Sequence, residues 1–507
     1  MMAHSIIAPV LLPLLAGIML VLLHRKSLVL QRSVNILSIL LQVILAAGLL
    51  SEVSNGNILT YSLGNWPAPF GILLVADRLA VWMLLITALV ALFSLLYALN
   101  GIDSNGHHFH ALFQLQLFGL NGAFLTGDLF NLFVFFEILL IASYSLLLHG
   151  GGRLRTKAGL HFVVINLVGS TLFLFAVGIL YGLLGTLNMA DLATRIAAMP
   201  QEQAPLIKAA GLLLFGVFAL KAALVPLYLW LPSAYAHTSA PVAALFAIMT
   251  KVGVYSILRI YTLLFGAQGG FAANLIEPWL LPMALLTLLV GMAGVVASTG
   301  LRQQTAYLVI ASVGSLLTAV GLNTEAGIAA GLYYLPHSTF AAAACFLLTN
   351  SIADRRGALA DKFEPAPPIQ HARWLGGLFF VTAVLLAGLP PLSGFIGKFM
   401  ILRAALAHPQ LAWIMAVILI TSLLALIALA RSGSLLFYKA QGEPPAPANM
   451  TTSTIFAETA PIVGLLSLCL LLVLLAGPVS GYLQLTAEQL LQPAGYIRAV
   501  LPMEEPA

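Results

Sequence analysis

Five ionisable residues stand inside apolar stretches of this sequence, where a charge is costly and proton transfer is the chemistry that could use it. They are Glu137, Lys221, Lys251, His337 and Lys398. A lysine at the centre of a bilayer costs about 2.5–3.5 kcal/mol. Three lysines and a glutamate together cost on the order of 10 kcal/mol, which matches the whole stability of many domains. Such residues persist only where they pair, reach water or lose their charge.

Two explanations compete for these residues. A buried ion pair that only fixes helix packing would account for Glu137 and one lysine, but it leaves two lysines unexplained. A proton relay accounts for all of them, because a desolvated ammonium releases its proton readily and a nearby carboxylate favours its return. His337, in YYLPHSTFAAAACF, is predicted to carry protons between Lys251 and Lys398, although a lone histidine in an apolar helix is more often a hydrogen-bonded packing residue.

Three further residues could assist this chemistry. His237 lies at a loop in AYAHTSAP and is either a point of proton uptake or a residue that only faces water. Tyr255 lies one turn after Lys251 and can hydrogen-bond to it. Asp128 stands where a helix begins and is expected to cap it. The sequence has no Gly-rich turn between a strand and a helix and no His/Cys cluster, so we expect neither a cofactor nor a metal site.

The helices that hold two of the lysines are interrupted by proline. Pro226 follows Lys221 by five residues, and Pro390 and Pro391 precede Lys398 in AGLPPLSGFIGKF, residues 387–399. In lipid, broken backbone is tolerated only where it is buried in protein or lines a water-filled cavity. Lys398 follows its break, near the amino end of a half-helix whose dipole disfavours a cation, so we expect it to release its proton more easily than Lys221.

The composition places these elements in a membrane. Of the 507 residues, 61% are hydrophobic and only 8% are charged, whereas soluble proteins carry roughly 25% charged residues. A spanning helix needs about 20 mostly apolar residues. This length predicts fourteen spans, the first a retained helix that begins at Ser5, with centres near residues 14, 42, 87, 118, 138, 172, 219, 251, 288, 312, 338, 389, 422 and 470.

We therefore predict an all-α membrane protein that forms a single transmembrane domain over residues 1–507. Discontinuous helices at matching places in two halves are typical of transporters built from inverted repeats. Spans 7 and 12 are the broken ones, and two five-helix repeats have opposite orientation because five is odd. The predicted parts are N-terminal helices 1–3 in 1–100, a first repeat in 108–265 (spans 4–8), a second repeat in 278–440 (spans 9–13), and a C-terminal helix with a tail in 455–507.

The lysines and arginines of the loops predict the orientation. Fourteen spans put both termini on one side of the membrane. With the termini outside, thirteen basic residues fall in inside loops and five in outside loops, as the excess of positive charge on the cytoplasmic side requires. Both termini are therefore expected on the periplasmic or external side.

Three stretches resemble one known family, namely GDLFNLFVFFEILLIASYSLL, LKAALVPLYLWLPSAYAHTSAPVAALFAIMTKVGVYSILR and LAGLPPLSGFIGKF. Over nearly its whole length the sequence is similar to the antiporter-like subunits that respiratory complex I shares with Mrp-type (Mnh or Pha) multisubunit monovalent cation/proton antiporters. Within this family it most resembles the D subunit of the Mrp type, because of TKVGVYSILR and because position 398 is lysine. By motif position, the family's proton-path residues fall on Glu137, Lys221, Lys251, His337 and Lys398.

The resemblance implies a secondary transporter subunit rather than an enzyme. It would work in a bacterial inner (cell) membrane, in a hetero-oligomer with other membrane subunits, and exchange Na⁺ or K⁺ for protons without nucleic acid. Two alternatives remain open. One is a proton-pumping membrane subunit of an NADH:quinone oxidoreductase or a membrane-bound hydrogenase, and the other is a non-conducting scaffold subunit whose buried charges only hold helices together.

Overall fold

The computed structural model describes residues 2–439 and 452–501. The last residue of the predicted second repeat, 440, and the end of the predicted tail, 502–507, lie outside these ranges. Helix is the main element of the described chain. This is the expected outcome in lipid, where each backbone N–H and C=O must find its partner within the protein.

The elements follow the order of the predicted parts. The N-terminal part contains α1 Ala8–Leu22, α2 Leu28–Ser54, β1 Leu59–Ser62, β2 Leu73–Ala76 and α3 Arg78–Ala98. The next part contains α4 Phe109–Leu125, α5 Leu129–Leu148, α6 Arg153–Leu184, α7 Met189–Ala197, α8 Ala204–Ala222, α9 Trp230–His237, α10 Ala240–Phe246 and α11 Met249–Leu263. After it come α12 Glu277–Ala297, α13 Leu301–Gly321, α14 Glu325–Asp354, α15 Ala372–Ala387, α16 Ser393–Ala404 and α17 Leu411–Gly433. The last described part contains α18 Thr452–Leu474, α19 Ala476–Leu491 and α20 Ala494–Val500.

Ten helical stretches of the described residues are long and apolar enough to cross a membrane. They match the predicted spans centred near 42, 87, 138, 172, 219, 251, 288, 312, 422 and 470. The other four predicted centres, near 14, 118, 338 and 389, fall on α1, on α4, on α14 and on the interruption between α15 and α16. The protein is therefore a multi-pass, mostly helical membrane protein.

Two features of the structure were not predicted from the sequence. The loop after α2 forms an antiparallel hairpin in which β1 pairs with β2, with Leu59 opposite Ala76. The buried strand β2 reads Leu-Leu-Val-Ala, a short apolar run that periodicity alone cannot assign to helix or strand. In addition, the predicted C-terminal tail contains two more helices, α19 and α20, after the predicted helix α18. Pro478 and Pro493 stand at the boundaries of α19 and α20, where the first turn of a helix tolerates proline.

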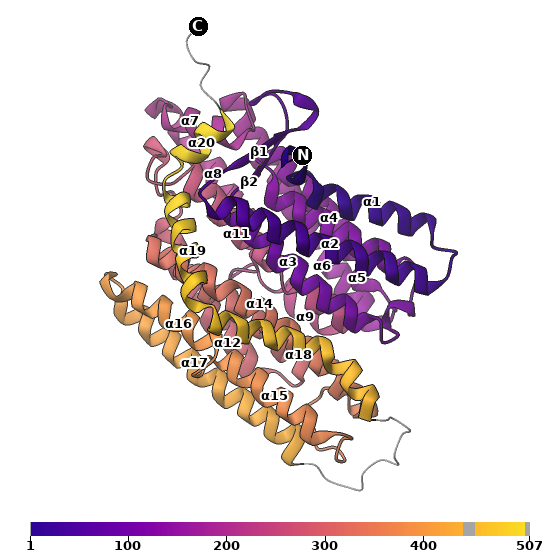
Figure 1. Ribbon diagram of the computed structural model, residues 1–507. Helices are drawn as coiled ribbons and strands as arrows, with labels where there is room; N and C mark the ends of the chain where they lie inside the picture. The colour runs from indigo at the N-terminus through magenta and orange to yellow at the C-terminus, as the bar shows by residue number, and fades with distance from the viewer. Residues whose placement is uncertain (1, 440–451, 502–507) are drawn as a thin grey trace.

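Helix α14 is the centre around which the other helices pack. It is buried along almost its whole length and contacts α3, α10, α13, α15, α16, α18 and α19. Pro336 lies inside it without ending it, because the helix continues to Asp354. Figure 1 shows α1 and α2 at one side of the molecule, α15 to α17 at the opposite side, and α18 with α19 running between them.

The two described ends of the chain lie at the same end of the bundle. The first turn of the chain contacts β1, and α20 contacts both β1 and α7. Figure 1 shows this group of elements together at the top of the view. The first described residues and α20 are thus on one face of the molecule.

Candidate functional site

The first helix interruption places Lys221 in the last turn of α8. This helix ends at Ala222, and Ala223 takes a left-handed conformation with φ 60°. The backbone remains outside regular α-helix through Pro226 until α9 begins at Trp230. Lys221 is 7% exposed. The carbonyl end of a helix favours a cation, so the end of α8 stabilises the ammonium of Lys221.

The second interruption holds Lys398. Helix α15 ends at Ala387, Gly388 has φ 78°, and α16 begins at Ser393 after Pro390 and Pro391. Lys398 Nζ donates hydrogen bonds to the Ala387 carbonyl (2.9 Å) and to Ser422 Oγ of α17 (2.9 Å). The ammonium therefore lies at the carbonyl end of α15. From the sequence, Lys398 was expected near the amino end of a half-helix, where the helix dipole disfavours a cation, and Lys221 near a carbonyl end. Both ammonium groups lie at the carbonyl end of a helix, so this expected difference is wrong.

Glu137 and Lys221 do not form a direct ion pair. Each is hydrogen-bonded to a side chain on the same face of α6. Ser170 donates a hydrogen bond to Glu137 Oε1, and Lys221 Nζ donates one to Asn166 Oδ1 at 3.2 Å. Asn166 and Ser170 are four residues apart, so they lie one above the other on the helix. The Lys221 ammonium also lies 5.9 Å from the centre of the Phe136 ring. Glu137 is half-buried on α5.

Lys251 is fully buried in the first turn of α11. Its Nζ donates a hydrogen bond to Ser312 Oγ of α13 at 3.2 Å. A Cβ at Gly253 would lie 2.4 Å from the backbone nitrogen of Ala222, so glycine is required where α11 crosses the end of α8. Lys251 and Lys221 are thus on touching helices, but no hydrogen bond joins their side chains within the described residues.

His337 and Lys398 face one small polar cavity. His337 is 1% exposed on α14, and its Nδ1 lies 2.9 Å from Ser393 Oγ at the start of α16. The cavity has about 20 Å³, enough for one water molecule. Its lining also includes Ser312, the hydrogen-bond acceptor of Lys251. Two of the five residues, His337 and Lys398, therefore line one space, and Lys251 is connected to it through Ser312. Glu137 and Lys221 form a second group.

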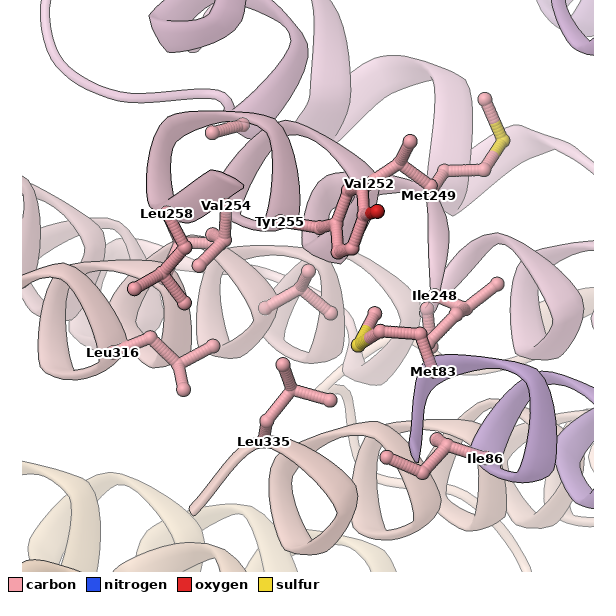
Figure 2. Packing of buried hydrophobic residues seen from close by; sticks show 14 of the residues in the cluster. Met83, Ile86, Ile248, Met249, Val252, Val254, Tyr255, Leu258, Leu316 and Leu335 are labelled. Carbon is pink, nitrogen blue, oxygen red and sulfur yellow. The ribbon is translucent and has the colours of Figure 1, made fainter. Parts of the chain in front are cut away.

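The three accessory residues have separate positions. The Tyr255 hydroxyl donates to the Phe124 carbonyl (2.6 Å) and accepts a hydrogen bond from Arg259, so the expected contact with Lys251 is wrong. Figure 2 shows Tyr255 packed among apolar side chains of the core. Asp128 caps α5, because its carboxylate accepts a hydrogen bond from the backbone N–H of Asn131. His237 ends α9 and lies in an open groove beside His161 and Lys157.

One buried ion pair was missed by the sequence reasoning. Arg259 is 4% exposed and makes two hydrogen bonds of 2.6 Å to Asp77. Asp77 also caps α3. The only sequence feature that indicated this pair was the position of Asp77, directly before the apolar run of α3. Among residues 2–439 and 452–501, no group of three or more His, Cys, Asp or Glu side chains could hold a metal ion.

The sequence and the structure of this chain were compared with known proteins, and the family model, the relatives and the solved structure that match are of the same kind. A family model described as NADH:quinone oxidoreductase/Mrp antiporter, TM, matches residues 126–425. A protein from Rhizobium meliloti (strain 1021), named as the D subunit of a probable K(+)/H(+) antiporter, is 42% identical over 98% of this chain and 97% of its own length. The D subunit of the Na(+)/H(+) antiporter of Alkalihalophilus pseudofirmus is 37% identical over 99% of this chain and 100% of its own. A chain of the solved Mrp complex from Dietzia sp. DQ12-45-1b has a TM-score of 0.87 at 28% identity, covering 98% of this chain and 99% of that one.

Proposed function

Because this chain belongs to the NADH:quinone oxidoreductase/Mrp antiporter family, we propose that it is the D subunit of a hetero-oligomeric Na⁺(K⁺)/H⁺ antiporter and that protons cross the membrane through it. Its partners would be the other membrane subunits of that complex. The support comes from relatives named as the D subunits of antiporters, which match almost end to end, and from a site whose buried cations all have polar partners.

The polar cavity between Ser312, His337 and Lys398 is the observation that carries this proposal. The Ser312 hydroxyl donates its proton to the Val309 carbonyl (2.7 Å). When this hydroxyl rotates toward the cavity, it can accept a proton from the Lys251 ammonium while it releases its own to the cavity. One water molecule there, for which the volume suffices, would deliver it to His337 or Lys398. The neutral lysine left behind would then be reprotonated from the other side of the relay.

In this mechanism Glu137 and Lys221 form the gate at one end. Ser170 and Asn166 hold the two groups on adjacent turns of α6, where their charges interact. A nearby carboxylate favours the charged form of a lysine. Protonation of Glu137 removes that carboxylate charge, so Lys221 releases its proton toward Lys251. The two residues act as a coupled pair although they make no direct ion pair.

The finer architecture is part of the same proposal. Fourteen spans would form two inverted five-helix repeats, 108–265 and 278–440, in which α8–α9 and α15–α16 are the broken spans. Both interruptions have a lysine at the carbonyl end of a helix, which supports the correspondence. The first turn and α20 both contact β1, which agrees with an even number of spans. The excess of basic residues in the opposite loops supports an external location of both termini.

Two alternative functions predict different outcomes in one experiment. Glu137→Gln or Lys221→Ala is introduced into the complete complex, and cation/proton exchange is measured together with assembly. The proposal requires exchange to fall while the subunits still copurify. A scaffold subunit would lose exchange only through failed assembly. A pump of a redox complex would instead copurify with iron–sulfur subunits and show no exchange in their absence.

A further inference from the structure

Four amide side chains form a ladder of hydrogen bonds between α2 and α4. The nitrogen of each amide donates to the oxygen of the next, from Asn121 to Gln42 (3.1 Å), from Gln42 to Gln114 (3.3 Å) and from Gln114 to Asn35 (2.7 Å). All four side chains are buried. The ladder extends along α4 from His110 to Asn121, which corresponds to about 16 Å of helix, or roughly half the hydrocarbon thickness.

His110 sets the direction of the ladder at one end. Its Nε2 lies 3.1 Å from Asp103 Oδ2, and a carboxylate oxygen only accepts, so Nε2 carries the proton of the neutral ring. Nδ1 is then an acceptor, and Asn35 Nδ2 donates to it at 2.8 Å. An amide donates only through its nitrogen and accepts only through its oxygen. The orientation of Asn35 therefore decides the orientation of every later amide.

The opposite end of the ladder holds α1. Asn121 Nδ2 also donates to the Pro9 carbonyl, at 2.7 Å. Within α1 this carbonyl would accept from residue 13, but Pro13 has no N–H. Helix α1 packs against both α2 and α4. Asn121 thus supplies the donor that α1 lacks, and it uses the same nitrogen that donates to Gln42.

Protonation of His110 is incompatible with this direction. An imidazolium donates at both nitrogens, so Nδ1–H would face the NH₂ group of Asn35, and a buried charged donor without an acceptor is costly. A turn of the Asn35 amide removes this conflict and moves it to the next amide, where the same step repeats. When the Asn121 amide turns, its nitrogen leaves the Pro9 carbonyl, so α1 loses this bond to α4.

One hydroxyl beside the ladder permits both directions. Ser38 Oγ donates to Gln114 (3.1 Å) and accepts from Gln42 (3.3 Å). A hydroxyl can exchange these roles by rotation. The ladder therefore has two complete orders, and the bond to Pro9 belongs to one of them.

The ionisable groups that face His110 are Asp103, Arg32 and His149. Arg32 donates two hydrogen bonds to Asp103, so its charge balances the carboxylate. His149 follows α5, and its charge would interact with that of His110. Helix α1 carries no ionisable residue. Histidine ordinarily changes its charge between about pH 5 and 8, so the ladder ends in a group of the kind that responds to pH.

We propose that the ladder is a pH-responsive switch, in which protonation of His110 reverses the amides and releases α1 from α4 at Pro9. The lysines and Glu137 of the proposed relay take no part in it. Helix α4 packs closely on α5, because a Cβ at Gly119 would lie 2.6 Å from Leu139 Cβ, and α5 carries Glu137. A dependence of exchange on the attachment of α1 rests on the proposed function, whereas the switch itself does not.

The test measures the position of α1 at two pH values. Leu15→Cys on α1 and Ile141→Cys on α5, which are 61% and 57% exposed, are spin-labelled in the full subunit within its complex, after Cys345 and Cys469 are replaced by Ala. Pulsed electron paramagnetic resonance gives the distance between the labels. A longer distance should gain population from about pH 8 to about pH 5, by at most tenfold per pH unit, the limit for one linked proton.

Two variants should abolish this shift. His110→Gln keeps a donor for Asp103 and an acceptor for Asn35 but takes up no proton, and Gln42→Met cuts the ladder with little change of volume. Either variant should keep the shorter distance at both pH values. Labels at Leu172→Cys on α6 and Ile141→Cys are the control pair, because α6 lies outside the ladder, and their distance should stay constant.

The outcomes separate the switch from the proposed function. Equal distance distributions at the two pH values, or the same shift in His110→Gln, would overturn the switch. A shift that persists in Gln42→Met would show that α1 responds without the ladder, which also overturns it. Failure of the proposed function would appear elsewhere, as unchanged exchange in Lys251→Ala, whatever the distances.

Discussion

At the scale of single residues, Lys398 depends on the glycine that ends the preceding helix. Gly388 has φ 78°, a left-handed conformation that glycine adopts without strain. A Cβ at this position would lie 2.8 Å from Lys398 Cδ and 3.0 Å from its Nζ. The glycine therefore permits both the turn and the contact of the ammonium with the carbonyl end of α15.

Gly388→Ala is predicted to displace Lys398 and to lower cation/proton exchange. The left-handed alanine costs about 1–2 kcal/mol, and the added methyl group pushes the ammonium away from the Ala387 carbonyl. We expect exchange to fall by about tenfold, since each 1.4 kcal/mol changes a rate tenfold. The measurement is exchange in vesicles with equal amounts of assembled complex. Gly377→Ala is the control, because its Cβ would meet no atom within 4 Å, and equal rates in the two variants would contradict the prediction.

The sequence predicts the buried cations but not their partners. A charge inside an apolar run is conspicuous, so Lys221, Lys251 and Lys398 stand out. Ser312 and Ser422, which accept their hydrogen bonds, do not stand out. Serine in a membrane helix commonly bonds its own backbone, as both Ser256 and Ser312 do here. Only the packing of α13 and α17 decides which hydroxyls turn toward a lysine.

At the scale of helices, α2 and α4 are joined by a buried hydrogen-bonded ladder. Each amide donates in the same direction, from Asn121 to Gln42, from Gln42 to Gln114 and from Gln114 to Asn35. The Asn35 amide nitrogen lies 2.8 Å from His110 Nδ1, and His110 Nε2 lies 3.1 Å from Asp103, which also pairs with Arg32. Gln114 and Asn121 interrupt the apolar run of the span near 118, and the ladder explains how the membrane interior tolerates them.

The carboxyl group of Asp103, at one end of this ladder, should make the stability of the fold depend on pH. Burial opposes ionisation of this carboxyl, but hydrogen bonds from His110 and Arg32 outweigh it and lower its pKa to about 2. The unfolded value is about 3.9. Because the folded pKa is the lower one, the carboxylate stabilises the fold above about pH 4, and this contribution is lost as the pH falls toward 2.

Asp103→Asn should therefore lower the melting temperature of the purified complex at neutral pH, for a loss of about 1–3 kcal/mol. The difference from the unchanged protein should shrink as the pH is lowered below about 4. Glu202→Gln, at an exposed position in the loop before α8, serves as the control. A difference that is constant over the whole pH range would show that the carboxylate charge does not contribute.

The helix interruptions were predictable and the hairpin was not. Proline removes a backbone donor, so Pro226, Pro390 and Pro391 mark both interruptions. Helix α8 nevertheless ends at Ala222, four residues before its proline, because Ala223 turns the chain first. Pro336 shows the limit of this rule, since neighbouring helices hold α14 intact around it. The pairing of β1 with β2 depends on contacts between separate segments, which local patterns do not contain.

At the scale of the whole molecule, the arrangement predicts where the two termini lie. With fourteen spans and the basic loops inside, tags at residue 1 and residue 507 should both be reachable from outside the cell. The measurement is labelling of each tag by a membrane-impermeant reagent in intact cells. A tag in the 149–152 loop, next to Arg153 and Arg155 in the first turn of α6, should react only after the membrane is opened. Labelling of one terminus alone would contradict the even number of spans.

The central claim is that Lys251 carries protons across the middle of this protein. The most direct measurement is proton-driven Na⁺ or K⁺ exchange by the purified, reconstituted complex that contains Lys251→Ala. Lys208→Ala is the matched control, because Lys208 is exposed on α8. We predict that the Lys251 variant assembles fully and exchanges no cation for protons, while the Lys208 variant keeps the normal rate. Exchange at the normal rate by the assembled Lys251→Ala complex would contradict the account.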